Sequence, residues 1–281
     1  MMLAALRHVL IGLVVVVAVT APWSIVAVAS LRLSPHVPWA VPMGFIYVGV
    51  VVAYLSGRGW PASTADIRRR HFRARLLSPA EAVWSLVAGS PAITCLWLLF
   101  AASGHLARQA APGREAGLST GVLFVFIIIG SAVTAIGEEG GFRGFMQAPL
   151  ERRVGPRVAI AVSAMAFVLI HATGGLPALA RNGPFYLAAG LVYGILAYLT
   201  QSILPALVLH FLGDILTFAL RSSLVRLSGP HTGVEITLCL AGAVVGLGLS
   251  IVAFGRLART TASTRLATYS RPDIAETGGP I

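Results

Sequence analysis

The sequence predicts an all-α polytopic membrane protein, a bundle of about eight transmembrane helices. Of its 281 residues, 57% are hydrophobic and only 11% are charged, less than half of the charged share that is usual in soluble domains. The mean hydropathy of +0.84 agrees with this class. The apolar segments are continuous, whereas the strands of membrane barrels alternate apolar and polar residues, so the spans are expected to be helices.

Eight apolar segments are the expected spans, and polar connections separate them. By residue number they are 9–31, 39–55, 82–102, 121–147, 158–172, 185–199, 203–220 and 234–254. A membrane-crossing helix needs about 20 residues, so the ends of the two short segments, the fifth and the sixth, are the least defined.

The first segment predicts an uncleaved membrane anchor. Arg7 precedes it, and Ala27-Val28-Ala29 resembles a signal-peptidase site, but the apolar stretch is longer than the roughly 7 to 15 residues of a signal-peptide core. Pro35, Pro38 and Pro42 then indicate a turn and the start of the second helix.

Basic residues predict the topology. All 21 are arginines, and they flank the spans, with a cluster in the connection 56–81 and others after Glu151 and near both termini. Positive connections stay in the cytoplasm, so eight spans give two cytoplasmic termini. The cluster in 56–81 is interpreted as a topology signal that also contacts lipid headgroups, with a substrate-recruiting patch as the alternative. Despite the net charge of +11, no nucleic-acid binding is expected, because no basic patch is interleaved with aromatic residues.

The chain is expected to divide into four parts. Residues 1–120 would form N-terminal transmembrane helices with the basic loop 56–81, residues 121–220 a catalytic core, and residues 221–259 a C-terminal transmembrane helix. The polar tail 260–281 has no periodic apolar face and is expected to be disordered. Gly190 and Gly194, and likewise Gly242 and Gly246, have the spacing that lets two helices approach closely.

Ionisable residues inside the apolar spans are the candidate site. The chain has ten acidic residues, and three of them, Glu138, Glu139 and Asp214, fall in or at the edge of spans, as do His171 and His210. A charge at that depth is costly unless it is paired or hydrated, so it suggests function. The helical rise of about 1.5 Å per residue puts Glu138, His171 and His210 at broadly similar depths, nearer the cytoplasmic side, where they can converge on one cavity.

These residues form three motifs that resemble a known family. Glu138-Glu139-x-x-x-Arg143, Phe167-x-x-x-His171 and His210-x-x-x-Asp214 follow one another on three successive apolar regions. In this order and membrane placement they are similar to the CPBP or Abi family, which includes the CAAX prenyl endopeptidases and bacteriocin-processing proteins. The resemblance covers residues 121 to 220.

The resemblance implies a membrane-embedded endopeptidase without a covalent intermediate and without a cofactor. Glu138 would be the general base that activates a water, and His171 would hold or share that water. Glu139 and Arg143, one helical turn apart, would pair and position Glu138. His210 would stabilise the oxyanion.

At the fourth position after that histidine the family often has asparagine, and this sequence has Asp214. An ionised aspartate cannot donate a hydrogen bond, so we expect Asp214 to orient His210 and to stabilise its cationic form.

Other interpretations compete with this one. Phe167 and Arg143 are expected to support the site by packing and pairing rather than to act directly. A zinc protease with His171, His210 and Glu138 as ligands is the metal-dependent alternative, although no His-Glu-x-x-His spacing is present. Cys95 and Cys239 lie in separate apolar segments and are expected to be free buried thiols. A non-catalytic membrane partner, immunity factor or transporter is the alternative to an enzyme.

The expected location is the bacterial cytoplasmic membrane, since the abundance of Arg, Ala, Val and Gly is typical of GC-rich coding. The expected partners are the lipid bilayer and a peptide or membrane-protein substrate. The motifs define how a peptide bond would be cut and leave open which bond it is. They also leave the oligomeric state open.

Overall fold

The computed structural model describes residues 2–33, 39–103, 118–172, 175–222 and 232–269, and its described elements are helices. This confirms the all-helical class. In chain order the elements are α1 (Met2–Leu33), α2 (Ala40–Leu55), η1 (Ala62–Thr64), α3 (Ala65–Phe72), α4 (Pro79–Ala102), α5 (Thr120–Glu138), η3 (Glu139–Gln147), α6 (Ala148–Val154), α7 (Pro156–Ile170), α8 (Gly175–Thr200), α9 (Leu204–Arg221) and α10 (Gly233–Tyr269). The element η1 is a 3₁₀ turn and η3 a π-helix.

Length and apolar composition make five helical segments of the described chain candidate membrane spans. They lie in α1, α4, the continuous run Thr120–Val154, α8 and α10. Three shorter apolar helices, α2, α7 and α9, correspond to the other expected spans. The helix α8 begins ten residues before the expected segment 185–199, and α7 begins two residues before 158. The total of eight spans and the orientation of the termini stay predictions.

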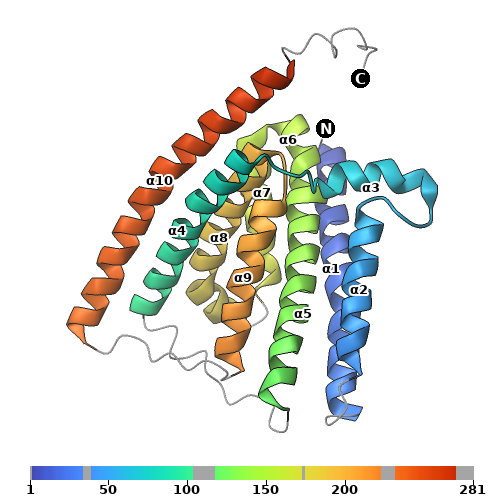
Figure 1. Cartoon of the computed structure of the whole chain (residues 1–281), viewed down its shortest axis with the longest axis horizontal. Helices are drawn as coiled ribbons and strands as arrows, with labels where there is room; N and C mark the ends of the chain where they lie inside the picture. The colour runs from blue at the N-terminus through green and yellow to red at the C-terminus, as the bar shows by residue number, and fades with distance from the viewer. Residues whose placement is uncertain (1, 34–38, 104–117, 173–174, 223–231, 270–281) are drawn as a thin grey trace.

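The run α5–η3–α6 stands in the middle of the bundle (Figure 1). On one side α1 packs against α5 and η3, with α2 beyond it, and on the other side α9 packs against α5. The pair α7 and α8 lies behind α9, and α10 covers the outer face of α4. The start of α1, the helices α3 and α6, and the end of α10 all lie at one end of the bundle, which is therefore its arginine-rich end (Figure 1).

Glycines allow the backbones of α1 and η3 to meet. A Cβ atom added at Gly12 would lie 2.7 Å from the carbonyl oxygen of Gly141, and one added at Gly141 would lie 2.6 Å from the carbonyl oxygen of Gly12. Gly194 and Gly246 are equally close to neighbouring helices, since added Cβ atoms there would come within 3.0 Å of other atoms. The prediction that these small residues permit close helix approach is confirmed.

The basic connection after α2 is more ordered internally than a plain topology signal requires. Arg68 is buried and donates hydrogen bonds to the carbonyl oxygens of Tyr54, Arg58, Gly59 and Pro61.

Two further arginines of this connection also have partners inside the protein. Arg73 forms a two-bond ion pair with Glu151 of α6, both distances being 3.1 Å. Arg75 pairs with Glu81, which completes the capping box of Ser78 at the start of α4. These arginines therefore fix α3 and the adjoining chain to the bundle instead of facing only headgroups.

The expectation of a disordered tail from residue 260 is wrong for its first ten residues. The helix α10 continues without a break to Tyr269, and extending an existing helix avoids the cost of nucleation. Residues 270–281 lie outside the described residues. Cys95 and Cys239, in α4 and α10, are both free thiols, as expected. Cys95 is buried, as expected, whereas Cys239 is only partly buried, because it lies on the outer helix α10.

Candidate active site

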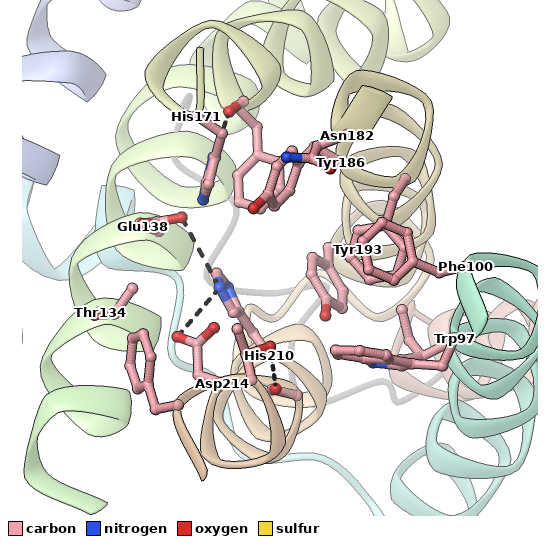
Figure 2. A pocket seen from close by; sticks show the side chains of 17 residues that line it. Trp97, Phe100, Thr134, Glu138, His171, Asn182, Tyr186, Tyr193, His210 and Asp214 are labelled. Atoms are coloured by element: carbon pink, nitrogen blue, oxygen red, sulfur yellow. Dashed lines mark hydrogen bonds and ion pairs between the residues drawn. The ribbon is translucent and has the colours of Figure 1, made fainter. Parts of the chain in front are cut away.

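A cavity of about 230 Å³ lies between α4, α5, α7, α8 and α9 (Figure 2). Carboxylates and imidazoles form one wall, and the aromatic side chains of α4 and α8 form the opposite wall. The lining residues are Ile93, Trp97, Phe100, Thr134, Glu138, Phe167, His171, Asn182, Phe185, Tyr186, Ala189, Tyr193, His210, Gly213, Asp214, Thr217 and Phe218. The structure therefore brings five of the seven expected residues to one cavity, namely Glu138, Phe167, His171, His210 and Asp214.

The two neighbouring glutamates have different surroundings, because consecutive residues of a helix point about 100° apart, and α5 changes to a π-helix between them. Glu138 ends α5 and lines the cavity, whereas Glu139 begins η3, is fully buried, and lies outside the cavity lining. π-Helical turns are rare and occur often at functional sites. Gly140, Gly141 and Gly144 make this wide turn compatible with close packing, since each has atoms of α1 or α3 within 3.3 Å of an added Cβ.

Glu139 links two motifs. Its Oε1 accepts a hydrogen bond from Arg143 Nη1 at 3.0 Å and lies 2.7 Å from His210 Nδ1. Arg143 is itself fully buried, donates from Nη2 to the Gly190 carbonyl oxygen at 3.1 Å, and lies 4.9 Å from the centroid of the Phe167 ring. The predicted pair of Glu139 with Arg143 is present, and the bond from Glu139 to His210 was not predicted.

His210 points its second ring nitrogen toward the other carboxylates. The Nε2 atom lies 3.6 Å from Asp214 Oδ2 and 3.9 Å from Glu138 Oε2 (Figure 2). Both distances exceed a hydrogen bond, so the bond that fixes the His210 ring comes from Glu139 rather than from Asp214. Glu138 Oε2 is buried and has no hydrogen-bond partner among the described residues.

His171 directly follows α7 as its C-cap and is held by that helix. Its Nδ1 donates to the carbonyl oxygen of Phe167 at 2.8 Å, which leaves Nε2 on the cavity side, near Glu138 in Figure 2. The ring is stacked on Tyr186, with centroids 4.1 Å apart. Phe167 is buried beneath this arrangement and contacts the rings of both His171 and His210. Phe167 thus packs as expected of a supporting residue.

Sequence reasoning missed the contribution of α8. Asn182, Tyr186 and Tyr193 line the cavity, and the Tyr193 ring is stacked on His210 at 5.2 Å between centroids and 12° between planes. Their spacing of four and seven residues is one and two helical turns, so they share a face of α8. Polar groups repeated at this spacing on an apolar helix were the signal that could have identified them.

The described residues contain no group of three or more His, Cys, Asp and Glu side chains arranged to hold a metal ion. The proposed zinc ligands His171, His210 and Glu138 line one cavity but do not form such a group. The geometry therefore gives the zinc alternative no support, and chelation is its test.

Comparison with models of known protein families gives a match. Residues 120–216 match the family described as type II CAAX prenyl endopeptidase Rce1-like. The match contains all three motifs, from Glu138 to Asp214. No curated protein and no solved structure matches the chain.

Proposed function

We propose, from the membership of residues 120–216 in the Rce1-like type II CAAX prenyl endopeptidase family of intramembrane proteases, that this cavity hydrolyses a peptide bond with an activated water. One observation carries the proposal. The Glu138 carboxylate is buried, faces the cavity, and has an oxygen, Oε2, without a hydrogen-bond partner among the described residues. A buried acceptor of this kind is costly unless a ligand or water satisfies it.

In the proposed reaction Glu138 is the base. It takes a proton from a water that His171 also contacts, and the water oxygen forms a bond to the carbonyl carbon of the substrate. The π electrons of the carbonyl move onto its oxygen, which His210 Nε2–H stabilises. The C–N bond then breaks, and Glu138 returns the proton to the leaving nitrogen.

The Glu139–Arg143 pair supports this chemistry from behind the cavity wall. Its two charges compensate each other in a fully buried place, and Glu139 holds His210 Nδ1, so that Nε2 stays on the cavity side. The carboxylates of Asp214 and Glu138 face Nε2 and stabilise a proton there by their charge. This arrangement gives His210 the donor role and makes Glu139 the residue that orients it.

Cleavage tests the proposal directly. Glu138→Ala and His171→Ala are each compared with the wild-type chain and with Glu235→Ala, which removes an exposed carboxylate at the start of α10. The readouts are processing of co-expressed candidate substrates and the whole membrane peptide population of the cells. We expect both site variants to lose processing and Glu235→Ala to keep it. Full processing by both site variants would refute the protease and favour a non-catalytic partner.

Metal dependence needs its own experiment. We expect purified wild-type protein to keep its activity after incubation with a zinc chelator, because Glu138 and His171 supply the base and the water contact. A loss on chelation that zinc restores would favour the zinc alternative.

We also propose that the cavity lies on the cytoplasmic side of the membrane. Glu138 is followed directly by η3 and α6, which lead to the arginine-rich end of the bundle, and His210 lies in the second turn of α9. Arginine-rich ends face the cytoplasm. Labelling of Arg153→Cys with a membrane-impermeant thiol reagent is expected in inside-out vesicles and not in intact cells, and the reverse result would invert the topology.

A further inference from the structure

We propose that the hydroxyl group of Tyr193 is a second hydrogen-bond donor to the carbonyl oxygen of the substrate, beside His210 Nε2. The proposal rests on the hydrolytic function proposed above and adds a catalytic residue outside its three motifs. Tyr193 lies on α8, whereas the motif residues lie on α5, η3, α7 and α9.

The wall around His210 has a shortage of donors. Asp214 occupies the position one helical turn beyond His210, and an ionised carboxylate only accepts hydrogen bonds. Glu138 is the base in the proposed reaction and is an acceptor in its ionised form. A developing oxyanion is best stabilised by more than one aimed donor. If His210 acted alone, the carbonyl oxygen would be surrounded by one donor, His210, and two acceptors, Asp214 and Glu138.

Tyr193 has the position that a second donor requires. Its side chain is 4% exposed, lines the cavity, and is stacked face to face on the His210 ring. The guanidinium of Arg143 lies 5.4 Å from the centroid of the same tyrosine ring. Tyr193 is thus held between His210 and Arg143, the two residues that Glu139 also contacts. Its ring therefore has little freedom to move relative to His210.

The Tyr193 hydroxyl itself is available. It has no hydrogen-bond partner among the described residues, and Figure 2 shows it directed into the cavity. At Gly213 of α9 an added Cβ would lie 3.9 Å from the hydroxyl oxygen, so no side chain at this position fills the space beside it. A phenol is a good donor, and a hydroxyl that faces the cavity without a protein partner can donate to a bound ligand or water.

Tyr186 shows that the arrangement is more than aromatic packing. It stacks on His171 from the same helix, two turns away from Tyr193, so α8 places one tyrosine against each catalytic imidazole. The His171 ring is already held by its bond to Phe167, and the His210 ring by Glu139. A phenylalanine at position 193 would provide the same stacking. The hydroxyl is the part of Tyr193 that packing does not explain.

The test removes the hydroxyl of Tyr193 and keeps its aromatic ring. Tyr193→Phe is measured against Tyr54→Phe, which removes the hydroxyl of a tyrosine on α2 far from the cavity lining. The probe is an internally quenched, farnesylated peptide with a C-terminal Cys-aliphatic-aliphatic-X sequence, chosen from the matched family. We expect Tyr193→Phe to lower kcat by about 10²-fold or more with little change in KM and in melting temperature, the size expected for the loss of one oxyanion donor. Tyr54→Phe should retain the wild-type kcat.

A binding measurement makes the result independent of turnover. A phosphinate analogue of the same peptide carries an anionic oxygen in place of the oxyanion, whereas the intact amide does not. Tyr193→Phe is expected to weaken phosphinate binding by about 10²-fold and to leave binding of the amide to a Glu138→Gln background unchanged. A kcat within about threefold of the wild type, or an equal loss of affinity for both ligands, would overturn the role of Tyr193.

Different results would refute the proposed hydrolysis and the donor role of Tyr193. If the wild-type protein neither cleaves the peptide nor binds the phosphinate more tightly than the amide, and the membrane peptide population of wild-type cells also equals that of Glu138→Ala cells, the proposed hydrolysis is wrong, and the donor role falls with it. If the wild type does both and Tyr193→Phe does so equally well, the hydrolysis stands and the donor role is wrong.

Discussion

Glu139 Oε1 and His210 Nδ1 lie 2.7 Å apart, a hydrogen bond between residues 71 positions apart in the chain. The same oxygen accepts from Arg143. One fully buried carboxylate therefore joins the first motif of the site to the third. Through this contact Glu139 has a structural role that its neighbour Glu138 does not have.

Substitutions at Glu139 and Arg143 should affect stability and activity differently. Glu139→Leu leaves Arg143 buried without its ion-pair partner, so the free energy of unfolding is expected to fall by about 3–5 kcal/mol. Glu139→Leu combined with Arg143→Met should recover most of that stability, because a buried pair can be replaced by apolar residues, and it should remain inactive because His210 is no longer oriented. Thermal unfolding in detergent and a cleavage assay measure the two effects. A double variant with wild-type activity would contradict the orienting role.

Asp214→Asn should retain cleavage. The bond that fixes the His210 ring comes from Glu139, so loss of the Asp214 charge leaves the ring in place, and an amide adds a donor beside Nε2. We expect kcat within roughly tenfold of the wild type or above it, against a loss of about 10²-fold or more for His210→Ala. If Asp214→Asn is as inactive as His210→Ala, the carboxylate is required, as the original orienting hypothesis for Asp214 held.

Gly12→Ala should loosen the packing of α1 on η3. Its Cβ would lie 2.7 Å from both the Gly141 carbonyl oxygen and the Met146 Cβ, and neither can move without shifting a helix. Overpacking of this kind costs about 1–3 kcal/mol, so the melting temperature should fall. Gly49→Ala is the matched control, because an added Cβ at Gly49 has no atom within 4 Å. Equal melting temperatures for the two variants would show that α1 and η3 do not need this close contact.

His71 should make stability depend on pH. It lies in α3 against Phe145, and its pKa is below the ordinary 6.5 because burial, then the charges of Arg152, His8 and Arg70, disfavour the cation. The unfolded chain therefore takes up the proton first. The stabilising contribution is present above about pH 6.5 and is lost as the pH falls below it.

The His71→Phe variant checks this, since a phenylalanine keeps the ring contact with Phe145 and does not titrate. We expect the melting temperature of the wild type to fall more steeply than that of His71→Phe between about pH 7 and pH 5.5. Parallel curves would show that His71 does not contribute to the pH dependence.

The sequence by itself determined the helical class and most of the reacting groups. Continuous apolar runs leave no choice but helices in lipid, and ionisable residues are so costly there that Glu138, His171, His210 and Asp214 stand out without any structure. Periodicity of one helical turn also predicted the Glu139–Arg143 pair. These are local properties, which residue type and spacing along one helix are enough to define.

Only the tertiary structure decided which residues contact each of the reacting groups. The π-helix begins at Glu139, and helix packing brings Glu139 to His210 and Tyr193 onto the same imidazole. Tertiary packing also gives Arg68 and Arg73 of the basic connection partners inside the protein, where the sequence predicted a topology signal that contacts lipid headgroups. Such contacts join residues far apart in the chain, and their existence depends on the distance and the rotation between helices. Spacing along a single helix determines neither.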